Sequence, residues 1–139
     1  MSGSSRAVTL ARDVRDSVVA HALEASPDEC CGLLLGCDDK IVEAARCRNI
    51  ADDPATRFLI DPEDHFVARR TARERGLDVV GFYHSHPKSP AEPSERDLAD
   101  FSYAGHLYLI VSLRAEPPEV GLFRLDAGNF QRVSFVTVA

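Results

Sequence analysis

The residues best suited to chemistry lie between positions 84 and 97, where two histidines precede a proline-rich loop, a serine and an aspartate. His84 and His86 fall in a stretch rich in Val, Phe and Tyr, which predicts a strand over 78–86. Alternate residues of a strand point to the same face, about 6 to 7 Å apart at the backbone, so both imidazoles can converge on one ion. The sequence therefore indicates a metal site at the end of this strand.

A third ligand must come from another element, and Asp97 is placed to supply it. The prolines at 87, 90 and 93 make the intervening loop stiff enough to fold the next helix back over the strand end. Asp97 lies in the first turn of that helix, the part nearest the loop. Two histidines and one carboxylate are ligands that zinc accepts, and a catalytic zinc keeps its fourth position for water.

The same residues have an alternative explanation. Ser94-x-x-Asp97 is also a capping box at a helix start, and taken alone the pair is better explained in that way. Two histidines in a strand can simply face solvent. The combination of aligned histidines, a rigid loop and a carboxylate at the next helix start favours the metal site.

A water held by zinc needs a base to take its proton. Composition alone does not choose among the candidates Glu24, Glu29, Glu43, Glu63, Glu92 and Glu95. Position favours Glu29, which leads directly into the apolar run "CCGLLLG". An exposed turn residue after Ser26-Pro27 is an equally good interpretation of Glu29.

The elements that must position these side chains are a mixture of strands and helices. Asp61-Pro62 predicts the start of a helix, and Ala127-Gly128-Asn129 predicts the turn of a closing hairpin. The interleaved pattern predicts a mixed sheet in a single α/β (α+β-like) domain. We expect strands over 7–10, 30–36, 40–47, 78–86, 106–113, 119–126 and 130–138, an extended stretch over 57–60, and helices over 13–25, 62–75 and 94–103.

Length, composition and charge indicate the number of domains, the location of the protein and the classes of partner to expect. The 139 residues, 45% hydrophobic and 27% charged, are typical of one globular domain, expected over residues 6–139 after a short flexible lead-in at 1–5. The sequence shows neither an apolar run long enough for a membrane helix nor the apolar centre of a signal peptide, so we expect a cytoplasmic protein without membrane contacts. A net charge of -6 without a basic stripe argues against nucleic-acid binding.

The other cysteines, histidines and aromatic residues are expected to be structural. Cys30, Cys31, Cys37 and Cys47 form no CxxC pair, and at least three of them are expected to be small buried thiols. For His21, His65 and His106 we expect surface, boundary or core positions without a chemical role, and for Phe82 and Tyr83 core packing. The stretch 55–61 is a candidate edge of a substrate groove.

The spacing of His84, His86, Ser94 and Asp97 resembles the signature H-x-H-x7-S-x2-D of the JAMM metalloproteases, also called MPN-plus or JAB domains. The family pattern also has an upstream glutamate shortly before a Cys-Gly and an apolar strand, which here is Glu29 in "ECCGLLLG". The similarity extends over nearly the whole chain. Five residues in the right order are a far more specific match than a lone pair of histidines.

This resemblance implies a role for each of the five residues. His84, His86 and Asp97 would bind one zinc ion per chain. Glu29 would be the general base that activates the water and then passes the proton to the leaving amine. Ser94 would donate a hydrogen bond to the oxyanion of the tetrahedral intermediate. The implied fold is a curved mixed sheet flanked by helices, similar to that of cytidine deaminases.

The resemblance also implies a substrate class. Family members cleave peptide or isopeptide bonds after the C-terminal Gly-Gly of ubiquitin or ubiquitin-like proteins. The chain lacks the long insertions of eukaryotic deubiquitinases and resembles the small prokaryotic members that act on ubiquitin-like sulfur carrier proteins. We therefore expect a carrier with a C-terminal Gly-Gly as the partner, and a homodimer is left open.

Three alternatives belong to other classes. A non-catalytic MPN-type interaction scaffold keeps the fold and loses the ligands, but all five motif residues are present here. A deaminase-like zinc hydrolase of small molecules would need a PCxxC pattern that the sequence lacks. A structural zinc site would need a fourth protein ligand.

Overall fold

The computed structural model of the protein describes residues 7–100 and 105–139. The lead-in predicted at 1–5 and the last part of the helix predicted over 94–103 lie outside the described residues. The elements are β1 (Val8–Ala11), α1 (Arg12–Ala25), β2 (Cys31–Cys37), β3 (Lys40–Cys47), α2 (Pro62–Glu74), β4 (Asp78–His86), α3 (Glu95–Asp100), β5 (Leu107–Ser112), β6 (Glu119–Asp126), β7 (Asn129–Arg132) and β8 (Phe135–Val138).

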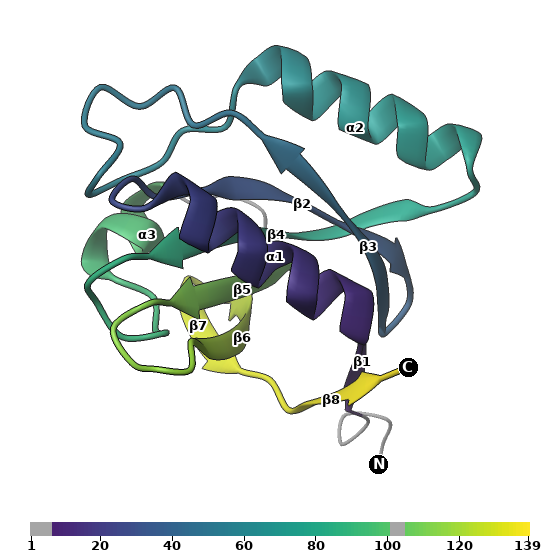
Figure 1. The fold of residues 1–139 in the computed structure, drawn as a ribbon. Helices are drawn as coiled ribbons and strands as arrows, with labels where there is room; N and C mark the ends of the chain where they lie inside the picture. Colours follow the sequence, from purple (N-terminus) through teal and green to yellow (C-terminus); the bar gives the residue numbers. More distant parts are fainter. Residues whose placement is uncertain (1–6, 101–104) are drawn as a thin grey trace.

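These strands form one mixed sheet in the order β7-β6-β5-β4-β2-β3-β1-β8. β4 pairs parallel with β5, and β1 pairs parallel with both β3 and β8. The other neighbouring strands are antiparallel. The single domain with a mixed sheet and flanking helices that the sequence predicts is confirmed (Figure 1).

The C-terminal strands bring the two edges of this sheet together. β7 and β8 lie at opposite ends of the strand order, although only Val133 and Ser134 separate them in the chain. So short a connection spans at most about 11 Å, and the sheet must therefore curl until its outer strands are neighbours. The prediction of one strand over 130–138 is wrong, because β8 leaves the hairpin with β6 and pairs with β1. This pairing covers an edge that β1 would otherwise expose.

Helices α1 and α2 cover opposite faces of the sheet (Figure 1). β2 runs between them and is buried from its first residue to Gly36, which confirms the prediction of a strand buried on both faces. Gly32 is required in β2, because a Cβ there would collide with the Tyr83 ring and the Ala45 carbonyl. Apolar side chains of β2 point alternately into the core under α1 and into the core under α2.

The start of α2 follows the prediction, and the segment before it forms one isolated antiparallel bridge but no strand. The Asp61 carboxylate accepts a hydrogen bond from the backbone N–H of Asp64 at 3.0 Å, and Pro62 occupies the first helical turn. The stretch 57–60, expected to be extended, contributes only an isolated bridge between Asn49 and Ile60. The long connection from β3 to α2 is therefore a loop whose two ends hydrogen bond to each other, from Ile50 N–H to the Leu59 carbonyl and from Asp61 N–H to the Arg48 carbonyl.

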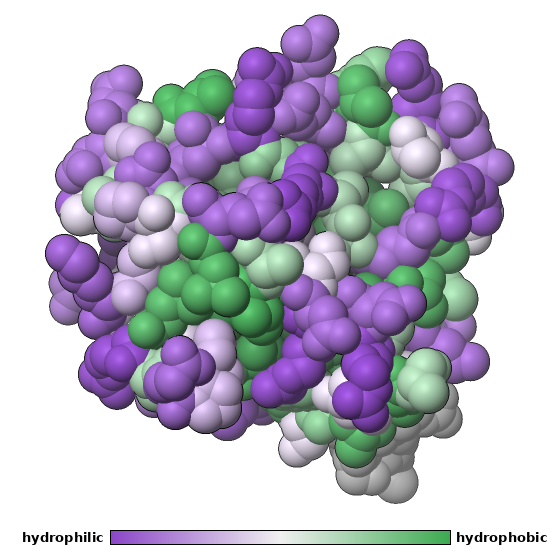
Figure 2. Space-filling view, in the orientation of Figure 1, coloured by the Kyte–Doolittle hydropathy of each residue, from purple (hydrophilic) through white to green (hydrophobic). Residues whose placement is uncertain are grey.

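The face of the molecule that carries α1 is largely hydrophilic (Figure 2), as expected of a chain in which 27% of the residues are charged. Figure 2 shows that hydrophilic residues cover much of the face on which α1 lies, with apolar residues gathered in a patch beside them. Within the described residues, every helix is too short or too polar to cross a membrane. All four cysteines are free thiols, and Cys30, Cys31 and Cys47 are buried as predicted, while Cys37 is exposed.

Candidate metal centre

His84 and His86 lie on the α2 face of β4. Phe82, two residues earlier, belongs to the core under α2, whereas Tyr83 belongs to the core under α1. The alternation of a strand therefore directs His84 and His86 to the same face as Phe82. The parallel neighbour β5 and the antiparallel neighbour β2 hold this end of β4 on both sides, so the two imidazoles stand on a rigid support.

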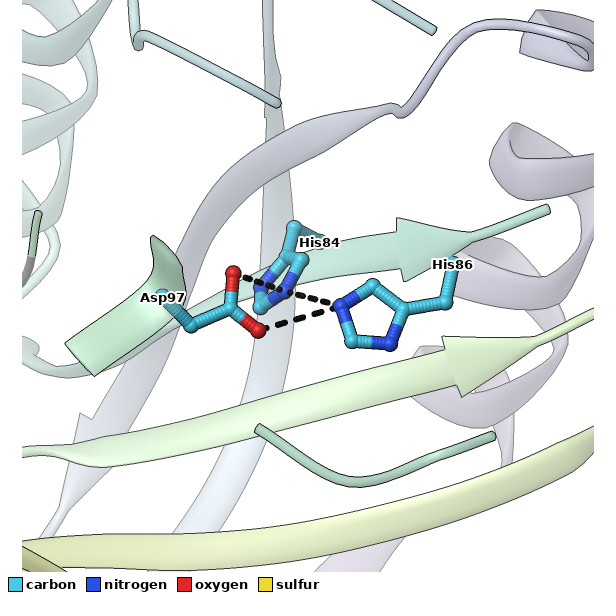
Figure 3. Close-up of side chains that lie close together, drawn as sticks. All are labelled: His84, His86 and Asp97. Atoms are coloured by element: carbon cyan, nitrogen blue, oxygen red, sulfur yellow. Dashed lines mark hydrogen bonds and ion pairs between the residues drawn. The ribbon is translucent and has the colours of Figure 1, made fainter. Parts of the chain in front are cut away.

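The structure brings His84, His86 and Asp97 into one cluster, in which the three side chains point toward one another (Figure 3). The Nε2 atoms of the two histidines are 3.1 Å apart. Oδ1 of Asp97 lies 3.2 Å from Nε2 of His84, and Oδ2 lies 3.1 Å from Nε2 of His86. The exposed fractions are 1% for His84, 3% for His86 and 5% for Asp97, so the cluster is buried.

This donor set fits a zinc ion. Zinc binds imidazole nitrogen and carboxylate oxygen at about 2.0 to 2.2 Å, which in a tetrahedron places neighbouring donor atoms about 3.3 Å apart. The separation of 3.1 Å between the two Nε2 atoms, and those of 3.2 and 3.1 Å from His84 and His86 to the two different oxygens of Asp97, are close to that value. Three protein donors on one side of the ion leave a fourth position for water or substrate.

Hydrogen bonds from the loop and from the start of α3 orient two of these side chains. The Nδ1 atom of His86 lies 2.8 Å from the carbonyl oxygen of Pro90. A carbonyl only accepts, so Nδ1 carries the proton and leaves the lone pair of Nε2 for a metal. The carboxylate of Asp97 accepts from the backbone N–H of Ser94 at 2.8 Å, and the Ser94 hydroxyl accepts from the backbone N–H of Asp97 at 3.0 Å. The capping box considered for this pair is therefore present.

The three side chains of the cluster shift one another's pKa in different directions. Burial opposes a charge on Asp97, but hydrogen bonds from His84 and His86 hold the pKa of Asp97 well below its usual range. Burial lowers the pKa of His84. Burial also disfavours a charge on His86, but its contacts with Asp97 and Pro90 outweigh burial and raise the pKa. Metal binding needs the ionised carboxylate and a free Nε2 lone pair on each ring, so His86 gives up the additional proton that its raised pKa favours when a metal binds.

Glu29 is a buried carboxylate near the cluster. It is only 7% exposed, so the interpretation as an exposed turn residue is wrong. Burial, the largest influence, raises the pKa of Glu29 to about 7, and the charges of His86 and Asp97 also act on it. Its Oε1 atom has no hydrogen-bond partner among the described residues. A carboxyl group with a pKa near neutrality and an unsatisfied oxygen is suited to exchanging protons.

Three neighbours of the site were not assigned to it from the sequence. Phe58 stacks on the ring of His84, with ring centroids 4.5 Å apart. The hydroxyl of Ser85 accepts from the backbone N–H of Cys30 at 2.8 Å, and Asn49 donates to the carbonyl of Glu29 at 2.9 Å. Only Phe58 had a sequence signal, since it lies within the candidate groove stretch 55–61.

The remaining histidines lie outside the cluster. Nδ1 of His21 is 2.7 Å from the Tyr83 hydroxyl, and Nε2 of His65 accepts from Arg69 at 2.8 Å. His106 lies beside the ring of Phe82, with centroids 5.8 Å apart. Phe82 and Tyr83 are buried, as predicted for core residues.

Sequence comparisons find relatives with related activities in their names. The family model described as prokaryotic homologs of the JAB domain matches residues 11–126. The chain is 40% identical to a desampylase of Haloferax volcanii over 78% of this chain and 83% of the relative. It is 34% identical to a probable TtuB-protein conjugate cleaving protease of Thermus thermophilus over 64% of this chain and 60% of the relative. It is 28% identical to a CysO-cysteine peptidase of Mycobacterium tuberculosis over 81% of this chain and 77% of the relative.

Solved structures share the fold. A Desulfitobacterium hafniense protein superposes with a TM-score of 0.86 at 29% identity, covering 94% of this chain and 92% of that one. A JAB1/MPN domain protein from Archaeoglobus fulgidus superposes with a TM-score of 0.64 at 24% identity, covering 96% of this chain and 99% of that one. The curled mixed sheet with its two large helices is therefore an arrangement that this chain shares with both.

Proposed function

Because this chain belongs to the prokaryotic JAB-domain family and is a JAMM-type peptidase, we propose that it hydrolyses the bond after the C-terminal Gly-Gly of a ubiquitin-like sulfur carrier protein. The bond is a peptide or an isopeptide bond. The observation that carries the proposal is the buried cluster of His84, His86 and Asp97 with Glu29 beside it. The names of two relatives, a probable TtuB-protein conjugate cleaving protease and a CysO-cysteine peptidase, support this substrate class.

His84, His86 and Asp97 would hold one zinc ion. Zinc, when bound, supplies Lewis-acid chemistry that makes a water acidic and polarises the scissile carbonyl. Pro90 fixes the ring of His86, and the backbone N–H of Ser94 fixes the carboxylate of Asp97. Such supporting contacts hold ligands in place without reorganisation, which supports a role in catalysis.

Glu29 would act as the general base and then as the general acid. Its carboxylate takes a proton from the attacking water, and the resulting carboxylic acid gives that proton to the leaving amine. The pKa of about 7 supports both steps, because neither protonation state is strongly disfavoured near neutral pH. Burial beside His86 and Asp97 keeps competing bulk water away from the reacting groups.

Ser94 would stabilise the oxyanion. Its hydroxyl oxygen already accepts from the backbone N–H of Asp97, which leaves the hydroxyl hydrogen to donate elsewhere. Donation to the developing oxyanion is the interaction that accelerates acyl transfer. The cap at the start of α3 and the catalytic role are thus compatible in one side chain.

A Gly-Gly tail suits a buried site of this kind. Without side chains, two glycines can pass between protein walls that would exclude larger residues, and their backbone can pair with an extended segment. The stretch 55–61 borders the site through Phe58, which supports a role for this stretch as one wall of the groove.

The test is hydrolysis of defined carrier fusions. A ubiquitin-like sulfur carrier protein would be prepared with one cysteine, a short peptide, or an isopeptide-linked lysine peptide after its Gly-Gly. We expect zinc-loaded protein to release the extension and leave a carrier mass ending at Gly-Gly, and we expect Glu29→Gln to release it at least about 100-fold more slowly. Intact fusions with wild-type protein, or equal cleavage by Glu29→Gln, would overturn the proposal.

The non-catalytic scaffold remains the alternative to distinguish. It predicts binding of the carrier without cleavage, whatever the extension. Measuring binding to a carrier that ends at Gly-Gly beside cleavage of the fusions separates the two. The buried glutamate and the complete donor set favour the peptidase.

A further inference from the structure

The side chain of Asn49 is the centre of a hydrogen-bond network in the loop after β3. Its Nδ2 group donates to the carbonyl of Glu29 at 2.9 Å and to that of Arg57 at 3.1 Å. Its Oδ1 atom accepts from the backbone N–H groups of Ala51 and Leu59, both at 3.0 Å. An amide has two donors and two acceptor lone pairs, so these four bonds use its full capacity.

One peptide group joins this network to the metal-binding strand. The carbonyl of Glu29 and the N–H of Cys30 belong to the same planar peptide. The carbonyl accepts from Asn49, and the N–H donates to the hydroxyl of Ser85 at 2.8 Å. Ser85 stands between His84 and His86 in β4. The peptide after Glu29 is therefore held on one side by the loop and on the other by the strand of the two histidines.

The preceding peptide is held by the same loop. The N–H of Glu29 donates to the carbonyl of Pro54 at 2.8 Å. Pro54 lies between Ala51 and Arg57, whose backbone groups Asn49 also binds. Removing the Asn49 amide would thus release a direct contact with Glu29 and loosen the segment that makes the second contact.

The contacts that hold Glu29 are made by its backbone. Oε1 has no hydrogen-bond partner in the described part of the chain, so side-chain contacts at that atom do not fix its direction. We propose that Asn49 is a positioning residue, which acts through Glu29 by fixing the peptide from which the catalytic carboxylate projects. This inference rests on the proposed function, in which Glu29 is the base.

The expected consequence is a loss in turnover rather than in substrate or metal binding. A displacement of about 1 Å in a catalytic group can cost about 100-fold in rate. We expect Asn49→Ala to lower kcat by about 10- to 100-fold, with KM changed less than about threefold and the zinc content unchanged. Asn49→Asp keeps an acceptor oxygen for the N–H groups of Ala51 and Leu59 but removes the N–H donor to the Glu29 carbonyl. Its kcat should fall by a similar factor.

Two experiments separate positioning from a general structural role. The first measures kcat of Asn49→Ala and Asn49→Asp on the carrier fusions, alone and combined with Glu29→Gln. If Asn49 acts through Glu29, its substitution lowers kcat in the wild-type background and has no further effect when Glu29 is already Gln. The second measures amide hydrogen exchange of Cys30 in metal-free protein, which should rise about tenfold or more in Asn49→Ala. Asn129→Ala, at an exposed position in β7, is the matched control for both.

The outcomes are distinct. If Glu29→Gln lowers kcat by about 100-fold or more but both Asn49 variants keep wild-type kcat, this inference is wrong and the proposed function stands. It is equally wrong if Asn49 variants lose the same factor in both backgrounds, or if both variants are unfolded at the assay temperature. If Glu29→Gln cleaves as fast as wild type, the proposed function itself fails, whatever the Asn49 variants do.

Discussion

Cys31, two residues after Glu29, lies opposite the metal-ligand candidate His84 in the antiparallel ladder between β2 and β4. The N–H of Ser85 donates to the carbonyl of Cys30 at 3.1 Å. Before this pairing the chain leaves the ladder: the N–H of Cys30 donates to the Ser85 hydroxyl, and the N–H of Glu29 donates to the carbonyl of Pro54. The carboxylate of Glu29 is close enough to the cluster for the charges of His86 and Asp97 to act on its pKa. The short run from Glu29 to Cys31 therefore fixes where the carboxylate stands relative to the cluster.

Zinc content tests the cluster directly. We expect about one zinc ion per chain in wild-type protein and a large loss in His86→Ala, because two remaining donors bind zinc poorly. Elemental analysis of purified protein after dialysis measures this. His65→Ala on α2 is the matched control and should retain zinc. Wild-type protein that stays metal-free after incubation with zinc would contradict the prediction and leave Ser94 and Asp97 as a helix cap alone.

Replacing the proposed base should remove turnover without removing metal. We expect Glu29→Gln to lower kcat by about 100-fold or more, since general acid–base groups contribute about 10²- to 10⁴-fold. Zinc content should stay at the wild-type level. Steady-state cleavage of the carrier fusions is the measurement, with the exposed Glu74→Gln as control. Activity within about threefold of wild type in Glu29→Gln would rule out the base role.

The buried carboxyl group of Glu29 should make stability depend on pH. Its pKa is raised to about 7 by burial, so the folded state binds the proton more tightly than the unfolded chain, whose value is near 4.5. The free-energy cost of ionising this buried carboxyl group in the folded protein is absent below pH 4.5 and grows as the pH rises through 7. In chelator-treated protein, the free energy of unfolding of wild type relative to Glu29→Gln should fall over this window. Denaturant unfolding at pH 5 and pH 8 measures it, and a difference that rises with pH would contradict the assignment.

Ser94 should show two separable effects. Ser94→Ala removes the helix cap, at a cost of about 1 kcal/mol in the free energy of unfolding, and also removes the proposed oxyanion donor. Loss of such a donor lowers kcat by about 10²- to 10³-fold, far more than the loss of a cap would explain. Thermal unfolding and kcat would be measured together. Ser94→Thr keeps the hydroxyl and should restore most of both, and a kcat unchanged in Ser94→Ala would exclude the catalytic role.

Much of the local structure could be predicted from the sequence because its signals are local. Asp61-Pro62 marks the start of α2 by capping chemistry, and the apolar run after Glu29 marks a strand buried on both faces. His84 and His86 are two residues apart, and this spacing alone places both side chains on one face of a strand. The buried thiols and the mixed sheet follow from composition and from the order of elements in the same way.

The C-terminal strands show where local signals fail. Residues 130–138 have one continuous strand-like pattern, and nothing in it marks the point after Arg132 where the chain changes partners. The break is decided by the curl of the whole sheet, which brings the free edge of β1 within reach of β8. The curl results from the twist between each pair of neighbouring strands, added over the whole sheet, so no single segment of the sequence encodes it.

The sequence by itself determined which side chains can do chemistry and on which elements they stand. Only the tertiary structure decided that Glu29 is buried rather than exposed, because its backbone is held by Asn49 and Pro54, which lie more than 15 residues further along the chain. The role proposed for Asn49 also depends on the tertiary structure, because the fold brings the carbonyls of Glu29 and Arg57 to its side-chain amide. Patterns in sequence report periodicity and capping, whereas hydrogen bonds between distant segments exist only after the sheet has brought those segments together.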